Sequence, residues 1–255
     1  RPQSTNKWQN SEIEGIDIML AIDVSTSMLA EDLKPNRLEA AKDVAAEFIN
    51  GRPNDNIGIT LFAGETFTQC PLTVDHAVLL DMIHNIKCGL IEDGTAVGMG
   101  VANAVTRLKD SKAKSKVVIL LTDGTNNKGD ISPLTAAEIA KSFGIRVYTI
   151  GVGTNGMAPY PYPVGNTVQY INMPVEIDEK TLTQIAGTTD GNYFRATSNS
   201  KLKEVYEEID KLEKTKLNVK EYSKREEDYR WFALAAFLCV LLEVLLRNSI
   251  LKKIP

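Results

Sequence analysis

Ile16-Asp17-Ile18-Met19-Leu20-Ala21-Ile22 is followed at once by Asp23-Val24-Ser25-Thr26-Ser27. An apolar run that ends in polar turn residues predicts a buried strand with a loop at its carboxyl end. The loop offers one carboxylate and two neighbouring serine hydroxyls, which are hard oxygen donors that suit Mg²⁺ or a similar divalent ion rather than zinc. Taken alone the pattern is weak, because serine and aspartate are also common in ordinary turns.

Further apolar, β-branched runs alternate with helical patterns along the chain. The runs that predict strands cover 16–22, 57–63, 117–122, 145–152 and a shorter one at 192–196. The patterns that predict helices cover about 35–51, 76–87, 96–109, 134–143, 178–187 and 199–214. Pro35 and Gly51 are expected to open and close the first helix. This alternation predicts an α/β fold, a doubly wound and mostly parallel sheet with helices on both faces.

Two more segments add oxygen donors to the same predicted edge of the sheet. Gly94 and Thr95 precede a helical stretch, and the apolar run 117–122 ends in Asp123. In open α/β sheets ligands bind outside the carboxyl ends of the strands, where Asp23 and Asp123 are both expected. Such residues also cap helices after strands, but three segments at the same edge favour a site.

Asp23-x-Ser25-x-Ser27, then Thr95, then Thr122-Asp123-Gly124 resemble, in this order, the metal-ion-dependent adhesion site of von Willebrand factor A domains. The resemblance covers the chain from about Gly15 to about Lys214. Other stretches resemble the BatA proteins of bacterial aerotolerance operons, namely Met28 to Leu38, Phe62 to Thr73, Thr149 to Pro161 and the hydrophobic C-terminus.

The resemblance implies a Rossmann-like fold and a six-coordinate Mg²⁺, with Mn²⁺ or Ca²⁺ as alternatives. Ser25 and Ser27 would bind the metal directly, and Thr95 directly or through water. Asp23 and Asp123 would act mainly through water and through hydrogen bonds to the serines. In this family a Glu or Asp of a partner protein supplies the sixth ligand. Thr122 is expected to face the opposite side of its strand and to support packing.

The leading functional interpretation is a non-catalytic, membrane-anchored module that binds and scaffolds other proteins. The resemblance implies other A-domain membrane proteins and a MoxR-type AAA+ ATPase as partners, and a role in aerotolerance or envelope stress. The net charge of −4 and the pI near 5.4 give no support to nucleic-acid binding. The alternatives are a Mg²⁺-dependent phosphoryl-transfer enzyme, which lacks a nucleotide-binding glycine loop here, and an adhesion domain for extracellular matrix.

The expected organisation is a linker over 1–14, the A domain over 15–214, a charged linker over 215–229, a transmembrane helix over 230–251 and a tail over 252–255. As a helix, Trp231 to Leu246 reaches about 24 Å, short of a hydrocarbon core of about 30 Å. Extension through Leu251 closes the gap, and a buried partner helix is the alternative. The resemblance places the protein in the bacterial inner membrane, with further spans upstream and the side of the domain open.

The segment 154–175 is rich in proline and tyrosine, and it follows a strand at the edge that carries the metal motif. Two interpretations stay open, a partner-recognition loop beside the metal and a proline-stiffened hairpin that packs on its own domain. The three cysteines are expected to be free thiols. Neither His76 nor His84 is expected to bind a metal, because both lie in one predicted helix at a spacing too wide for an i,i+4 pair.

Overall fold

β1 (Asp17–Asp23) is buried along its whole length and lies inside the sheet. Its neighbours β2 (Asn56–Phe62) and β4 (Lys116–Thr122) both run parallel to it, so that Ile22 lies beside Leu61 and Leu121. A parallel strand covered on both faces is a continuous apolar run rather than an alternating one. Residues 18–22 are such a run, which explains why this stretch takes an interior position.

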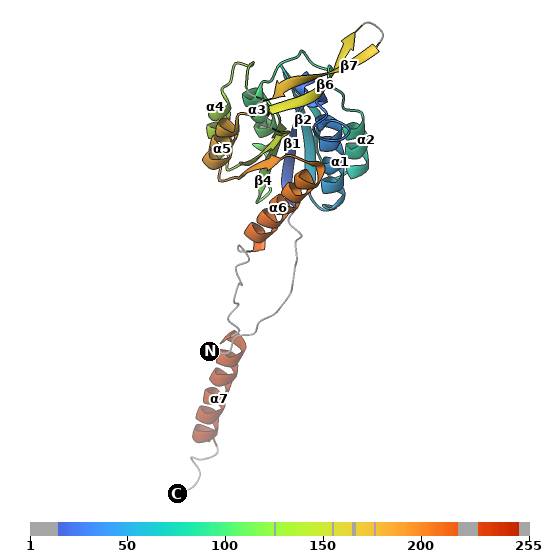
Figure 1. The fold of residues 1–255 in the computed structure, drawn as a ribbon. Helices are drawn as coiled ribbons and strands as arrows, with labels where there is room; N and C mark the ends of the chain where they lie inside the picture. Colours follow the sequence, from blue (N-terminus) through green and yellow to red (C-terminus); the bar gives the residue numbers. More distant parts are fainter. Residues whose placement is uncertain are drawn as a thin grey trace. The chain divides into compact units, whose positions relative to one another are not determined.

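The computed structural model describes residues 15–124, 126–154, 156–164, 167–175, 177–218 and 229–249. The six-stranded sheet has the order β3-β2-β1-β4-β5-β8 and is parallel except for the β2–β3 pair (Figure 1). Its other strands are β3 (Thr66–Thr73), β5 (Arg146–Val152) and β8 (Tyr193–Ala196). The helices of this domain are η1 (Thr26–Leu29, a 3-10 helix), α1 (Arg37–Asn50), α2 (His76–His84), α3 (Val97–Leu108), α4 (Pro133–Ser142), α5 (Glu179–Thr188) and α6 (Asn199–Asn218). The predicted α/β class and mostly parallel sheet are confirmed.

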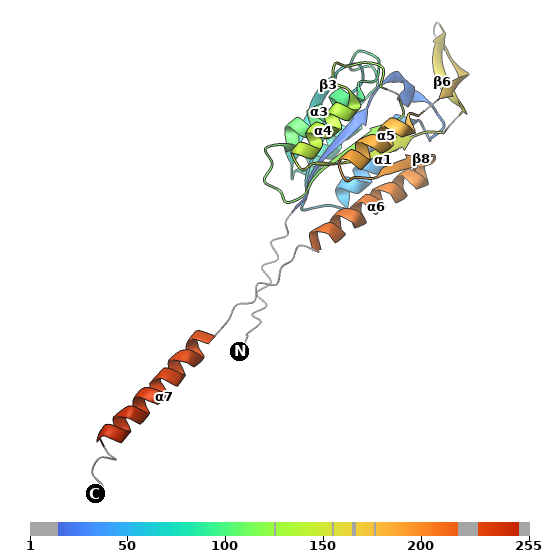
Figure 2. The same ribbon diagram turned by 90° about the vertical axis from the view of Figure 1, so that its left-hand side faces the viewer.

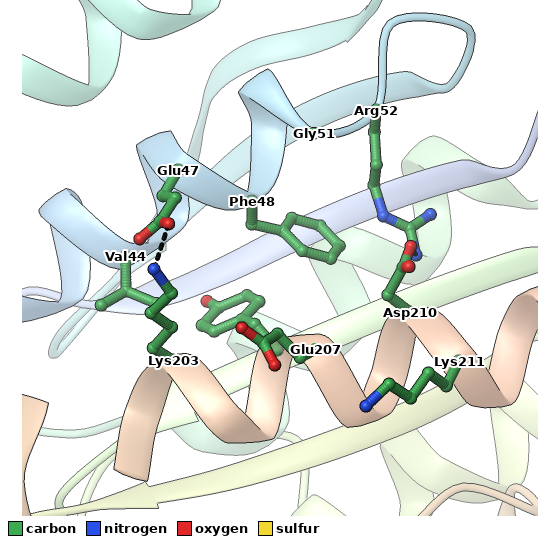
Figure 3. Close-up of a pocket in the computed structure, with 10 residues that line it drawn as sticks. Val44, Glu47, Phe48, Gly51, Arg52, Lys203, Glu207, Asp210 and Lys211 are labelled. Atoms are coloured by element: carbon green, nitrogen blue, oxygen red, sulfur yellow. Dashed lines mark hydrogen bonds and ion pairs between the residues drawn. The ribbon is translucent and has the colours of Figure 1, made fainter. Parts of the chain in front are cut away.

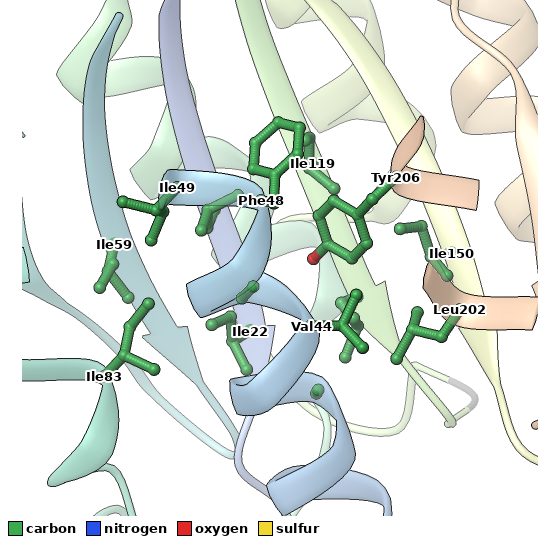
Figure 4. Close-up of a cluster of buried hydrophobic side chains, with 14 of the residues drawn as sticks. Ile22, Val44, Phe48, Ile49, Ile59, Ile83, Ile119, Ile150, Leu202 and Tyr206 are labelled. Atoms are coloured by element: carbon green, nitrogen blue, oxygen red, sulfur yellow. The ribbon is translucent and has the colours of Figure 1, made fainter. Parts of the chain in front are cut away.

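Two apolar cores cover the two faces of the sheet. On one face α1, α2 and α6 pack over strand residues such as Ile22 and Ile119, and the rings of Phe48 and Tyr206 lie 4.9 Å apart between α1 and α6 (Figure 4). The other face is covered by α3, α4 and α5 (Figure 2), which pack over residues such as Met19. The side chains of β1 alternate between the cores, as the period of a strand requires.

Five of the described helices begin at a side chain that accepts a hydrogen bond from a backbone N–H of the first turn, which is the usual way to satisfy an unpaired donor there. The capping residues are Asn36, Asp75, Ser132, Asp178 and Ser198. The predicted helix start at Pro35 is therefore wrong. α1 begins two residues later, because Asn36 caps it through the N–H of Glu39 at 2.8 Å.

The sequence pattern does not predict β3, the antiparallel edge strand. Of its eight residues only Cys70 is buried, so the strand lacks the apolar run that marks the interior strands. An edge strand with one solvated face carries a weaker signal than a strand covered on both faces. Edge position, rather than an unusual local structure, explains the omission.

The segment after β5 forms a hairpin, with β6 (Gly156–Val164) paired antiparallel to β7 (Thr167–Val175) in a separate two-stranded sheet (Figures 1 and 2). Ala158 at its base is fully buried, and the N–H of Glu31 donates to the carbonyl oxygen of Pro159 at 2.9 Å. The hairpin is thus attached to the loop that follows β1. The structure thus confirms a hairpin attached to its own domain, and partner recognition by this segment stays a prediction.

The chain divides into two compact units, one of which is Ile13–Leu217; the other holds α7 (Tyr229–Ser249) and is described by itself. α7 lies where a transmembrane helix was predicted over 230–251, but no helix in the described part of the chain has the length and apolar character needed to cross a membrane. The predicted span is therefore not confirmed. Arg230, Glu243 and Arg247 fall within α7. The predicted span also relied on residues 250 and 251, which lie outside the described residues.

The other predicted segments are described only in part. The linker over 1–14 and the tail over 252–255 lie outside the described residues, as do residues 219–228 of the charged linker. α6 continues to Asn218, beyond the predicted domain end at 214.

Ile119 tests the core beneath α1 and α6. Ile119→Ala is expected to lower the free energy of unfolding by about 2–5 kcal/mol, because it removes buried methyl groups and leaves a cavity. Val74→Ala, at a position that is 65% exposed, is the control and should change stability by less than about 0.5 kcal/mol. Urea unfolding followed by circular dichroism measures both. Equal losses in the two variants would contradict the assigned core.

Candidate functional site

The candidate site lies where the strand order changes direction between β1 and β4. From β1 the chain crosses to β2 on one side, and it later returns to β4 on the other side of β1. Such a switch point leaves a crevice at the carboxyl ends of the two strands. Asp23 is the last residue of β1 and Asp123 follows the last residue of β4, so both carboxylates lie at this crevice.

The loop after β1 turns its hydroxyls toward Asp23. The N–H of Ser25 donates to Asp23 Oδ1 at 2.9 Å, and the Ser25 side chain also hydrogen-bonds to that carboxylate. Ser25 also stands directly before η1, and the tight turn of this helix places Ser27 Oγ 3.0 Å from Ser25 Oγ. A short 3-10 turn directly after the strand thus gathers one carboxylate and two hydroxyls.

Asp123 completes a chain of hydrogen bonds across the switch point. Ser27 Oγ donates to Asp123 Oδ1 at 2.8 Å. Asp23, Ser25, Ser27 and Asp123 are therefore linked in sequence, from the end of one strand to the end of its neighbour. The structure brings together these four of the five predicted residues by direct contact.

The fifth residue, Thr95, approaches from the loop before α3. A Cβ built on Gly124 would lie 3.2 Å from Thr95 Oγ1, so the Thr95 hydroxyl lies against the turn that carries Asp123. The N–H of Thr95 donates to the side chain of Asn127 at 2.9 Å, and the N–H of Asn127 donates back to the Thr95 carbonyl at 3.0 Å. Thr95 is buried and held at the same edge as the other four. Its role as a ligand stays a prediction, as does that of the others.

Asp93 fixes the Thr95 loop to the loop after β1. Its carboxylate accepts from the N–H of Thr26 at 3.0 Å and from the Thr26 hydroxyl at 2.8 Å. Gly94 follows at φ +130°, a conformation that favours glycine, and leads directly into Thr95. Two loops that are far apart in the sequence are thereby held in one arrangement.

The expectation for Thr122 is wrong. Its hydroxyl does not serve packing on the far side of the strand but donates to Asp23 Oδ2 at 2.5 Å. The alternation of side chains along one strand predicts the face of the sheet on which a residue lies. It does not predict which side chain of the neighbouring strand that residue contacts. Thr122 therefore positions Asp23 from the adjacent strand.

Arg37 is a site residue that the sequence analysis missed. Its side chain is only 1% exposed, and its Nη1 donates to Asp123 Oδ2 at 2.6 Å. The same guanidinium binds both carboxylate oxygens of Asp32, with Nε and Nη2 at 2.7 and 2.6 Å. A signal existed in the sequence, because a basic residue in the first turn of a helix is unfavourable for the helix dipole and needs another explanation.

Asp32 extends this arrangement to the base of the hairpin. Its Oδ2 accepts from the N–H of Thr154 at 2.7 Å and from the Thr154 hydroxyl at 3.1 Å. Burial raises the pKa of Asp32, but the hydrogen bonds from Arg37 and Thr154 outweigh it and hold this pKa below its usual range. Asp32 is thus a carboxylate that stays ionised between the site and the hairpin.

The two carboxylates of the site oppose each other's ionisation. Burial and the charge of Asp123 together raise the pKa of Asp23 to about 7, against the lowering effect of hydrogen bonds from Ser25 and Thr122. Burial also raises the pKa of Asp123, although Arg37 offsets part of the effect. Buried like charges of this kind are stabilised by an added cation. Together with the hard hydroxyl donors, they fit a divalent metal ion.

The thiols and imidazoles do not join the site. Cys88 Sγ donates to the carbonyl oxygen of Ser25 at 3.4 Å, and burial raises the pKa of this thiol to about 12. His76 and His84 each hydrogen-bond to a backbone carbonyl, of Asp55 and Leu80. In the described part of the chain no group of three or more His, Cys, Asp or Glu side chains is placed to hold a metal, so any metal would depend on the hydroxyl donors. All three cysteines are free.

A cavity of about 310 Å³ lies between α1 and α6, away from the residues of the candidate site (Figure 3). Phe48 and Tyr206 line it beside an ion pair of Lys203 and Glu47. The guanidinium of Arg52 lies 4.5 Å from the centre of the Phe48 ring. The lining side chains named here contact one another, and none of the lining residues belongs to the candidate site.

The family model of the von Willebrand factor type A domain matches residues 17–208. The chain belongs to this family. The match contains all five candidate residues, and it agrees with the switch-point geometry described above. The expectation of a von Willebrand factor A fold is confirmed.

Two solved structures from Bacteroides are similar to this A-domain chain. BatB from Bacteroides thetaiotaomicron is 34% identical with a TM-score of 0.70, and the match covers 78% of this chain and 100% of that one. An aerotolerance-related membrane protein from Bacteroides fragilis is 33% identical with a TM-score of 0.67, covering 77% and 100%. The predicted relationship to aerotolerance proteins is confirmed, with BatB rather than BatA as the named neighbour.

Other similar proteins extend the comparison. A Borreliella burgdorferi protein is 27% identical over 242 residues, 94% of this chain and 71% of that protein. A Mycolicibacterium paratuberculosis protein is 30% identical over 203 residues, 74% of this chain, and the match spans only 58% of its own length. The mussel byssus protein PTMP1, described with a zinc-occupied adhesion motif, is 26% identical with a TM-score of 0.61, covering 78% of this chain and 45% of its own.

Replacing Arg37 tests how strongly the domain depends on the ion pairs at this edge. Arg37→Met is expected to lower the free energy of unfolding by about 3–5 kcal/mol, because it leaves Asp32 and Asp123 buried without their partner. Lys34→Met, which removes a 75% exposed lysine paired with Glu31, should cost less than about 1 kcal/mol. Urea unfolding of both variants makes the comparison. A loss in Arg37→Met no larger than in Lys34→Met would contradict the assignment.

The raised pKa of Asp23 predicts a pH dependence in metal-free protein. The folded-state pKa lies above the ordinary value of 3.8, so between about pH 4 and about pH 7 the folded state binds more protons than the unfolded state, and stability falls as pH rises. Asp23→Asn removes this loss. In EDTA, the difference in free energy of unfolding between Asp23→Asn and wild type should therefore shift in favour of the variant between about pH 4 and about pH 7. The expected shift is at least about 1.4 kcal/mol, which is equivalent to one pKa unit.

Chemical unfolding at a series of pH values measures this difference. Asp43→Asn, which removes an exposed carboxylate of α1, is the control for the change in net charge. A difference between Asp23→Asn and wild type that stays constant with pH would show that Asp23 is not the group responsible.

Proposed function

We propose that this chain is a non-catalytic protein-binding module that holds Mg²⁺ at Asp23, Ser25, Ser27, Thr95 and Asp123. The observation that carries the proposal is the hydrogen-bonded chain of two carboxylates and two hydroxyls across the β1–β4 switch point. Ordinary helix caps do not require such a chain, since a cap satisfies a backbone donor of its own helix. Mn²⁺ and Ca²⁺ are alternative ions for the same oxygen donors.

The bound ion would supply a positive centre that a carboxylate of a partner protein can complete. Ser25 and Ser27 are neutral donors, and Arg37 already engages Asp123 Oδ2. The protein therefore offers the ion few negative charges of its own, and an acidic side chain from outside remains a favourable ligand. The zinc-occupied motif described for PTMP1 supports a metal site in this fold.

The histidines of the chain do not supply a general base to the site. The chain has two histidines, and both lie in α2, each with one ring nitrogen hydrogen-bonded to a backbone carbonyl. A serine nucleophile requires a base within hydrogen-bond reach, and the carboxylate beside Ser25 is Asp23, which the proposal assigns to the metal ion together with Ser25 and Ser27. The arrangement supports binding rather than phosphoryl transfer.

We place this module at the bacterial inner membrane, in a complex that serves aerotolerance or envelope integrity. The name of the Bacteroides fragilis neighbour, an aerotolerance-related membrane protein, supports this setting. The proposed partners are proteins that present a Glu or Asp to the metal, including other A-domain membrane proteins and a MoxR-type AAA+ ATPase. These partners follow from the family resemblance.

Metal binding by the full chain tests the proposed Mg²⁺ site. Mg²⁺ should bind wild type, while Asp23→Ala and Ser25→Ala should lose at least about tenfold in affinity, or about 1.4 kcal/mol, because each removes an oxygen donor from the chain of contacts. Isothermal titration calorimetry measures the affinity, and circular dichroism shows that each variant keeps its secondary structure. Ser142→Ala, at the exposed end of α4, is the matched control. Unchanged Mg²⁺ affinity in both site variants would refute the assignment.

A further inference from the structure

The face of the hairpin that is turned toward the loop after β1 is apolar. Residues directly opposite each other in an antiparallel pair lie on the same face, and the register pairs Ala158 with Met173 and Tyr160 with Ile171. These four residues line one cavity together with Tyr162. Alternation along both strands therefore collects apolar and aromatic side chains on this face.

This cavity, of about 360 Å³, is closed on its other side by Thr26, Ser27 and Ala30. It lies within the range of about 300–1,000 Å³ that is usual for ligand sites. The described residues that line it include no charged side chain. Met173 and Ile171 are nonetheless 41% and 40% exposed, so the cavity is open to an incoming side chain.

Ser27 belongs to both the cavity and the candidate metal site. Its Oγ contacts Ser25 and Asp123, while the residue also lines the cavity. A carboxylate that reaches the metal at Ser27 therefore brings the residues next to it into the mouth of the cavity. The positive ion selects the acidic side chain, and the uncharged lining beside it favours an apolar neighbour, since burial of apolar surface is the gain available there.

We infer that the cavity between the hairpin and the loop after β1 is a specificity subsite for a large apolar side chain adjacent to the acidic residue of a partner protein. The inference rests on the proposed metal-dependent docking. It assigns the hairpin β6–β7 a binding role, and it narrows the partner from any protein with an exposed acid to one that carries an acid beside a residue such as leucine.

The hairpin is also placed firmly enough to form a subsite. The N–H of Glu31 holds Pro159 at 2.9 Å, and Asp32 holds Thr154 just before β6. The Glu31 carboxylate hydrogen-bonds to the Tyr170 hydroxyl, which raises the pKa of Tyr170. Contacts from two consecutive acidic residues of one loop thus fix the cavity walls relative to Ser27.

Two labelled peptides, capped at both ends so that one central glutamate is the sole carboxylate, test the inference on the full chain. One has leucine on both sides of the glutamate and the other has serine. With Mg²⁺, wild type should bind the leucine peptide about tenfold more tightly, equivalent to about 1.4 kcal/mol. Met173→Ser should reduce this ratio to about threefold or less while Mg²⁺-dependent binding of the serine peptide remains. Fluorescence polarisation measures both affinities.

Met157→Ser is the matched control, since Met157 is an exposed methionine of the same hairpin that does not line the cavity. It should keep the wild-type ratio. If wild type bound both peptides with equal affinity and only in the presence of Mg²⁺, the inferred subsite would be wrong, whereas the proposed Mg²⁺ site would be supported. Binding unaffected by EDTA or by Asp23→Ala would instead overturn the proposed function, and the inference with it.

A second copy of the chain is the competing occupant. If sedimentation showed Mg²⁺-dependent dimers that Met173→Ser dissociates, the cavity would be a self-association site, and the partner assignment would be wrong. Monomers in Mg²⁺ together with the leucine preference support the inference.

Discussion

The close approach of two buried carboxylates, Asp23 and Asp123, is the constraint on which this edge of the domain depends. Parallel pairing of β1 with β4 sets Ile22 beside Leu121, so the polar residues that end both strands meet at one point. Neither carboxylate is exposed to water that could screen the other. The surrounding contacts are arranged to compensate, with hydroxyl donors on one side of the pair and the guanidinium of Arg37 on the other.

This compensation also connects distant parts of the chain. Arg37 joins Asp123 to Asp32, and Asp32 joins the loop after β1 to Thr154 at the base of the hairpin. The candidate site and the base of the hairpin are therefore joined by charged groups with fixed partners.

The sequence predicts those parts of the structure that depend on local pattern and on the period of a strand. The apolar runs predict the interior strands, and the spacing from Asp23 to Ser27 predicts which side chains meet at the switch point. The contact of Thr122 with Asp23 was missed because it crosses between strands, and one strand's alternation does not identify the residue opposite. Arg37 was missed because its partner Asp123 lies 86 positions away and nothing in a helical pattern reports burial. β3 was missed because an edge strand lacks a continuous apolar run.

The prolines of β6 determine how a partner can approach the hairpin. Pro159 and Pro161 lie opposite Asn172 and Tyr170, and neither has an amide hydrogen. The carbonyl oxygen of Pro159 points out of the ladder to the N–H of Glu31. The outer margin of β6 therefore presents acceptors with few donors, and it is a poor template for the addition of another strand. The hairpin can carry exposed apolar side chains beside the crevice while resisting edge-to-edge aggregation.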